Sequence, residues 1–250
     1  MARRSAHSPR PSRVWPTRST ETARTRFREA LRGGRFLGPE LTIAVGLLTC
    51  GLIGLLPLPF GGTPVLVALG ALSLWLRGEG ARGVGLRRAP PGWRHVVVLG
   101  LAAGIGYQLL SLYVVEPLTA RFIGRLPDVS IFAPLRGNVS LLVLYLATSW
   151  TLAGFGEEFV YRGYLLNRIA QVFGGGRRAW VAALAVTTVL FGLGHGYQGA
   201  SGVIDTGLFG LLFGVLYVYG GRNLWVPVIA HGVADTTAFA LLFFGKYPGM

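Results

Sequence analysis

The sequence predicts an all-α fold, that of a polytopic helical membrane protein with about seven transmembrane helices. Hydrophobic residues make up 52% of the 250 residues and charged residues only 14%, and the mean hydropathy is +0.52. This composition is typical of a membrane protein rather than of a soluble domain. Apolar stretches close to the length that crosses a bilayer core, about 20 residues in a helix, recur between residues 41 and 244.

Turn-forming residues separate these stretches. Pro57, Pro59 and Pro64 mark the first turn, Pro90 and Pro91 precede the third stretch, and the glycine run 174–176 precedes the fifth. The second stretch is short, and glycines interrupt the end of the fifth. The expected helices cover residues 41–58, 64–77, 95–115, 139–161, 180–196, 203–220 and 224–244.

The chain divides into three parts by composition. Residues 1–37 contain ten arginines together with many Ser, Thr and Pro residues, so they cannot bury enough apolar surface to fold. We expect them to form a disordered basic cytoplasmic tail. Residues 38–138 are expected to form the N-terminal transmembrane helices. Residues 139–244 form the third part, which contains the polar residues described below.

The positive charge predicts how the protein lies in the membrane. The net charge is +14, but no basic stripe with interleaved aromatic residues occurs in a soluble segment, which argues against nucleic acid as a partner. With the N-terminus in the cytoplasm, 20 of the 24 basic residues lie inside, as the positive-inside tendency requires. We therefore expect a multi-pass protein of a bacterial inner (cytoplasmic) membrane with the lipid bilayer as its surroundings.

Two carboxylates and an arginine interrupt the fourth stretch. An ionised side chain at the bilayer centre costs roughly 3 kcal/mol, so such residues usually have a function. Glu158 and Arg162 are four residues apart and share a helix face, whereas Glu157 points about 100° away. The pair can neutralise itself and leave Glu157 as a general base. The alternative is a salt bridge at the end of the helix, near the cytoplasmic interface.

His195 lies among glycines in an apolar stretch. A single histidine on an apolar helix is more often a hydrogen-bonded residue between helices than a ligand. Gly192, Gly194 and Gly196, however, leave room for a backbone or a substrate to approach closely. This favours a functional histidine without excluding the structural one.

His231 and Asp235 share a face of the last predicted helix. The pair can ligate a metal, or the aspartate can fix the tautomer of the histidine, or both can join helices structurally. Polar groups on three successive predicted helices are poorly explained by three unrelated structural roles, which favours one shared site. Glutamate and histidine without a side-chain nucleophile indicate activated water that attacks a carbonyl, with or without a metal.

These residues resemble the CAAX-processing and bacteriocin-processing (CPBP, or Abi) family of intramembrane proteases. The resemblance covers roughly residues 139–241. It rests on Glu157-Glu158 with Arg162, then Phe191 with His195, then His231 with Asp235, in that order. It implies that residues 139–244 form a CPBP/Abi-like catalytic core.

The resemblance implies hydrolysis of a peptide bond in a membrane-associated protein or peptide. Glu157 and His195 would activate water, His231 and Asp235 would face the oxyanion, and Glu158 and Arg162 would brace the site. Family members often have asparagine at the position of Asp235. Because an ionised aspartate cannot donate to an oxyanion, Asp235 must be protonated, orient His231 or bind a metal. The residues do not decide whether a cofactor is bound, and the candidate is one divalent metal such as zinc.

A simple crossing by the fourth and fifth helices would separate Glu157 from His195. Glu157 would then lie near the cytoplasmic face and His195 near the outer one. We therefore expect a long helix from about 139 to 172, with the fifth helix ending at its glycines inside the protein.

Two other functions fit the same residues. One is a non-catalytic membrane scaffold or bacteriocin-immunity protein of the same fold, as some CPBP relatives are. The other is an ion or proton carrier that uses buried acids as a relay. A scaffold tolerates Glu157→Gln, a peptidase does not, and a carrier shows transport that depends on Glu157 or Glu158.

Overall fold

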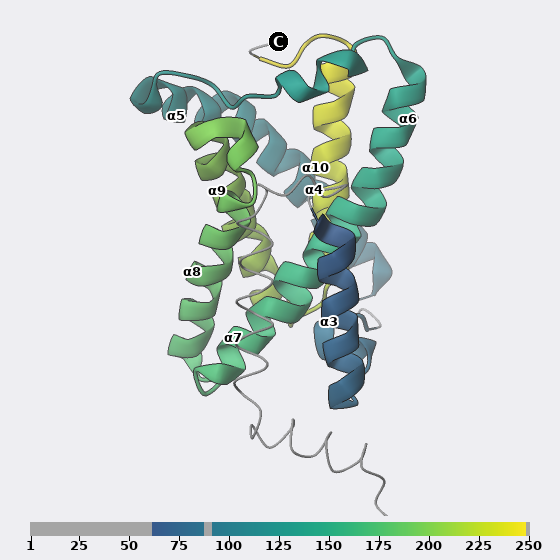
Figure 1. The fold of residues 1–250 in the computed structure, drawn as a ribbon, viewed down its shortest axis with the longest axis vertical. Helices are drawn as coiled ribbons and strands as arrows, with labels where there is room; N and C mark the ends of the chain where they lie inside the picture. Colours follow the sequence, from purple (N-terminus) through teal and green to yellow (C-terminus); the bar gives the residue numbers. More distant parts are fainter. Residues whose placement is uncertain (1–61, 88–91, 249–250) are drawn as a thin grey trace, which may run out of the picture.

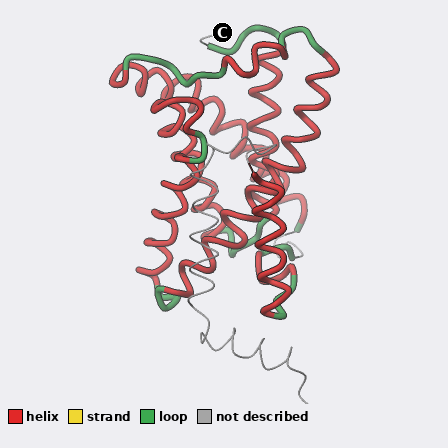
Figure 2. The backbone as a smooth tube through the Cα atoms, viewed as in Figure 1, coloured by secondary structure: helices red, strands yellow, loops and turns green. Residues whose placement is uncertain are grey.

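The computed structural model describes residues 62–87 and 92–248 (Figure 1). Of these residues 82% are helical, and none of them forms a strand (Figure 2). The predicted fold class is confirmed. The tail predicted at 1–37 and the helix predicted at 41–58 lie outside the described residues.

The described residues form eight α-helices joined by short 3₁₀ and π segments. The α-helices are α3 (Thr63–Arg77), α4 (Trp93–Leu110), α5 (Glu116–Ile123), α6 (Val139–Thr148), α7 (Leu166–Val172), α8 (Arg177–Leu193), α9 (Gly199–Tyr219) and α10 (Trp225–Phe243). The 3₁₀ segments are Ala81–Val84, Ser130–Leu135 and Gly196–Gln198, and the π segments are Ser111–Val115, Ser149–Glu157 and Phe159–Leu165.

Four helical stretches of the described residues are long and apolar enough to cross a membrane. They are Trp93–Ile123, Val139–Val172, Gly196–Tyr219 and Trp225–Phe243. The remaining described helices of the prediction are shorter, since α3 has 15 residues and α8 has 17. The protein is therefore a multi-pass membrane protein, and its helices follow the predicted stretches closely.

The fourth predicted helix is longer than the range 139–161. Helical residues run without a break from Val139 to Val172, 34 residues in all. At 1.5 Å per residue this long helix spans about 50 Å, and it crosses the bundle diagonally from α6 to α7 (Figure 1). The side chain of Asn138 caps its first turn by accepting a hydrogen bond from the Leu141 amide at 3.1 Å. The long helix expected from the separation of Glu157 and His195 is thus confirmed.

Small residues bring the helices close together. A Cβ atom at Gly104 of α4 would lie 2.4 Å from the Ala230 carbonyl oxygen of α10, which no side chain permits. Similarly, a Cβ atom at Gly214 of α9 would lie 2.4 Å from the side chain of Leu184 on α8. Close packing at these glycines positions α10 beside α4 and α9 beside α8.

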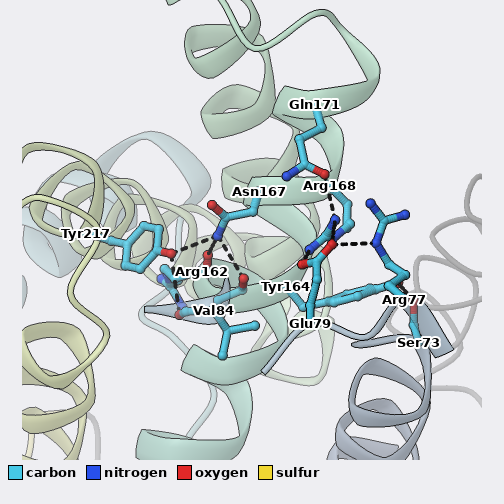
Figure 3. A network of polar contacts seen from close by, with 11 residues as sticks. Ser73, Arg77, Glu79, Val84, Arg162, Tyr164, Asn167, Arg168, Gln171 and Tyr217 are labelled. Atoms are coloured by element: carbon cyan, nitrogen blue, oxygen red, sulfur yellow. Dashed lines mark hydrogen bonds and ion pairs between the residues drawn. The ribbon is translucent and has the colours of Figure 1, made fainter. Parts of the chain in front are cut away.

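A polar network connects the C-terminal end of the long helix, which is its lower end in Figure 1, to the neighbouring helices (Figure 3). Glu79, just after α3, binds the guanidinium groups of both Arg168 and Arg77, the latter at 2.8 Å. Asn167 donates to the hydroxyl of Tyr217 on α9 at 2.8 Å. The network holds the long helix in register with α3 and α9, and it contains none of the predicted site residues except Arg162, whose backbone carbonyl accepts from Asn167.

Candidate active site

The long helix and α8 place Glu157 and His195 at a similar height in the bundle. Both helices meet at the turn of residues 173–176, from which α8 rises 17 residues, about 26 Å. The part of the long helix below Glu157 has nearly the same length, so α8 ends beside the middle of the long helix. His195 lies in the turn just after Leu193, as expected for a helix that ends inside the protein.

Close backbone approach joins the long helix to α10. A Cβ atom at Gly154 would lie 3.3 Å from the Gly232 amide nitrogen, and one at Gly232 would lie 2.6 Å from the ring of Trp150. Because neither position has room for a side chain, the π segment Ser149–Glu157 and α10 lie in direct contact. This contact brings the two glutamates next to His231.

Glu158 is the centre of a charged cluster that is shielded from solvent. Its side chain is completely buried, and its Oε1 accepts from Nη1 of Arg162 at 2.8 Å. Nδ1 of His231 lies 2.8 Å from the same oxygen. The pairing of Glu158 with Arg162 is the one predicted from their spacing, whereas the contact with His231 was not predicted.

Arg162 is fixed on both sides of its guanidinium group. Nη2 donates to the carbonyl oxygen of Gly210 on α9 at 3.1 Å. The guanidinium carbon also lies 4.4 Å from the centre of the Phe191 ring, a cation–π contact. Arg162 therefore connects the long helix to α8 and α9 and does not line the cavity described below.

Glu157 differs sharply from its neighbour Glu158. It lines the cavity, and its Oε2 is buried without a hydrogen-bond partner among the described residues. The turn of about 100° between adjacent helical residues explains why one carboxylate faces the charged cluster and the other faces the cavity. A carboxylate with a free oxygen in an apolar cavity is suited to accept a proton.

His195 is oriented by the helix that precedes it. Its Nδ1 lies 2.8 Å from the carbonyl oxygen of Phe191, one turn earlier in α8. A carbonyl only accepts, so Nδ1 carries the hydrogen and the Nε2 atom of the neutral ring is left as an acceptor. Of the flanking glycines, Gly192 packs against the α9 backbone, while Gly194 lines the cavity.

Asp235 is held by a serine that the sequence analysis did not single out. Ser149 donates to Oδ2 of Asp235 at 2.7 Å, and Nε2 of His231 lies 3.7 Å from the same oxygen. The nearest carboxylate to His231 is therefore Glu158 rather than Asp235. A serine in an apolar helix carries no spacing signal, so only the tertiary contact reveals it.

One cavity of about 600 Å³ joins these side chains. Glu157, His195, His231 and Asp235 line it, while Glu158 and Arg162 lie behind its wall. The volume lies within the usual range of small-ligand sites. Residues from outside 139–244 also line it, among them Leu66 of α3, Tyr107 of α4 and Tyr247. The six predicted residues thus form one connected site with contributions from the N-terminal helices.

The donor set does not fit a metal as the side chains lie. A zinc site usually takes three protein ligands, and no group of three His, Cys, Asp or Glu side chains among the described residues is arranged to hold an ion. Glu158 and Nδ1 of His231 are engaged with each other. Of the two alternatives left open by the sequence, no observation among the described residues supports the metal-assisted one.

The fold and site together define a class, that of multi-pass membrane proteins with a cavity lined by acids and imidazoles. Residues 139–237 match the family model of the Rce1-like type II CAAX prenyl endopeptidases. The match contains all six predicted site residues, and it confirms the resemblance to the CPBP family over this segment. Over this segment the chain is similar to the CAAX-type intramembrane proteases. No curated protein and no solved structure is significantly similar to it.

Proposed function

We propose that the protein is an intramembrane endopeptidase that hydrolyses a peptide bond with water activated by Glu157 and His195. The single observation that carries this proposal is the shared cavity. Four side chains from the long helix, α10 and the turn after α8 line it, and they include a carboxylate with a free oxygen and an imidazole with a free acceptor nitrogen.

The reaction follows from these positions. Glu157 takes one proton from a water held between it and Nε2 of His195, and the water oxygen attacks the carbonyl carbon of the peptide bond. The proton then passes to the amide nitrogen, the carbon–nitrogen bond breaks, and a carboxylic acid and an amine leave. No side chain becomes covalently attached to the substrate.

His231 would stabilise the oxyanion of the tetrahedral intermediate. Its ring contacts Glu158 at 2.8 Å and Asp235 at 3.7 Å, and these two carboxylates can balance a positive charge on the ring. His231 lines the cavity, and in the charged form its Nε2 carries a hydrogen that it can donate. Asp235, where an asparagine is common in the family, would then orient His231 instead of donating to the oxyanion itself.

The cellular setting of the proposal comes from the distribution of charge. The loop of residues 173–176 and the end of α3 lie at one end of the bundle, and the end of α10 lies at the other (Figure 1). Among the described residues, the arginine-containing stretches 77–87 and 168–178, which the positive-inside tendency assigns to the cytoplasm, lie at the first end. We propose a bacterial inner membrane with a cytoplasmic N-terminus, and a membrane-associated peptide or protein segment as substrate.

The test is cleavage of a synthetic peptide library by the purified protein in lipid nanodiscs, read by mass spectrometry. Glu157→Gln should lower turnover by about 10² to 10⁴-fold, the usual contribution of a general base. Asp128→Asn, at an exposed acid whose side chain does not line the cavity, is the matched control and should cleave as the wild type does. Full turnover by Glu157→Gln would overturn the role of Glu157, and a wild type that cleaves no peptide would favour the scaffold function.

A further inference from the structure

We propose that one wall of the cavity is a subsite for a cationic group of the substrate, an ammonium or a guanidinium. Asp205 would bind the cation, with Glu116 behind it as a second negative charge. The inference rests on the proposed function, because the cation would belong to the peptide that is cleaved. Neither acid was singled out by the sequence, and neither takes part in the hydrolysis described above.

The two acids belong to one hydrogen-bonded cluster. Oδ1 of Asp205, on α9, accepts from Ser111 at 2.9 Å and lies 3.0 Å from the hydroxyl of Tyr107. Ser111 also lies 3.3 Å from Oε1 of Glu116, which accepts from Tyr247 at 2.6 Å. One face of each carboxylate is therefore fixed by hydroxyl groups, and the two acids are linked through Ser111.

The cluster lacks a compensating positive charge. Glu116 is 1% exposed, and its Oε2 is buried without a hydrogen-bond partner. Within residues 62–87 and 92–248, neither Glu116 nor Asp205 forms an ion pair with arginine or lysine. An uncompensated carboxylate in apolar surroundings is costly, so a ligand that supplies positive charge would bind there favourably.

The cluster is open to the same cavity as the proposed active site. Asp205, Tyr107, Gln108 and Tyr247 form a wall of this cavity, which Glu157 and His195 also line. A cation at Asp205 would therefore lie in the same cavity as the bond that is cleaved. The π segment Ser111–Val115 directly precedes Glu116, and π turns are frequent at functional sites.

The chemistry of the wall selects an organic cation. Ionised carboxylates only accept hydrogen bonds, so the occupant has to donate them, and ammonium and guanidinium groups donate several. The ring of Phe209 contacts Tyr107 edge-on at 5.2 Å beside the acids. Such aromatic rings pack well against the alkyl part of a lysine or arginine side chain.

The first experiment measures binding without cleavage. Octylguanidinium and its neutral counterpart octanol are added to the purified protein, and the shift in melting temperature is compared. Octylguanidinium should stabilise the wild type, Glu157→Gln and the exposed-acid control Asp128→Asn more than octanol does. In Asp205→Asn, and in the second variant Glu116→Gln, this excess stabilisation should disappear. Equal effects of the two probes on the wild type would overturn the inference.

The second experiment profiles cleavage of the peptide library described above. The wild type should prefer lysine or arginine over norleucine at one position near the cleaved bond by about tenfold or more, as the loss of a charge-assisted hydrogen bond predicts. Asp205→Asn should abolish this preference and Asp128→Asn should keep it. Cleavage without any such preference would overturn the subsite and leave the proposed peptidase intact. Binding of octylguanidinium without a lysine or arginine preference in cleavage would indicate that the acids bind the amine of a lipid. This result would also overturn the substrate subsite. Loss of the peptidase itself is read separately, from Glu157→Gln.

Discussion

The acid next to the C-terminal end of the long helix and the acids around the cavity differ in how their negative charge is compensated. Glu79 at the lower end is bound by two arginines (Figure 3). Glu158, behind the cavity wall, is bound by Arg162 and His231. Glu157 and Glu116 each keep a buried oxygen without a partner among the described residues. The compensated acids hold helices together. Of the uncompensated ones, Glu157 lines the cavity where we propose chemistry, and Glu116 lies behind the wall where we propose binding.

The largest expected difference is in stability, between a variant of Glu158 and a variant of Glu157. Glu158→Ala leaves Arg162 buried and unpaired, and breaking such a pair costs about 3–5 kcal/mol. Glu157→Gln removes a carboxylate that has no salt-bridge partner, so the melting temperature should stay equal or rise. Thermal unfolding of both variants in the same detergent measures the contrast. Equal destabilisation by the two variants would remove the distinction between the two glutamates.

A smaller effect should follow from removing the hydroxyl that holds Asp235. Ser149→Ala should lower the turnover number by about tenfold, because Asp235 loses a hydrogen bond worth roughly 1.5 kcal/mol and holds His231 less firmly. Thr151→Ala is the matched control, since the hydroxyl of Thr151 bonds only to the backbone of its own helix. A tenfold loss in both variants would point to a general effect on the helix instead.

The smallest effect is the pH dependence of the stability that Glu79 contributes through its pairs with Arg77 and Arg168. Burial alone raises the pKa of Glu79, but the hydrogen bonds and charges of Arg168 and Arg77 outweigh it and bring the pKa below its ordinary value of 4.5. Between the folded pKa of Glu79 and pH 4.5, the unfolded chain therefore binds more protons than the folded chain does. The stability that Glu79 contributes is present above pH 4.5 and is lost as the pH falls through its folded pKa.

Melting temperatures measured stepwise below pH 4.5 check this sign. The wild type should lose more stability than Glu79→Gln over the same steps, because the variant has no carboxylate to protonate. Since Glu79 is partly exposed, the difference should be small. A wild type that gains stability in acid relative to the variant would contradict the role of the two arginines.

The sequence predicts those features that depend on local spacing. The apolar stretches located the helices because a bilayer requires long apolar runs. The pairing of Glu158 with Arg162 was predictable because residues four apart share a helix face. The continuation of the fourth helix to Val172 followed from the need to bring Glu157 to the height of His195.

Contacts between helices were not predictable in the same way. His231 and Glu158 are 73 positions apart, and Ser149 and Asp235 are 86 apart. Helical periodicity shows which face is polar, but it does not show which other helix that face meets. The cluster of Glu116 and Asp205 was missed for this reason, because the two acids lie on separate helices, α5 and α9, and each looks isolated in the sequence.

The most direct test of the account is a comparison of Glu157→Gln, His195→Ala and the double variant in single-turnover cleavage of one library peptide. If both side chains activate the same water, the double variant should be no slower than the slower single variant, because residues that act as a unit are strongly non-additive. Losses that multiply in the double variant would show that Glu157 and His195 act independently, and this would contradict the shared site.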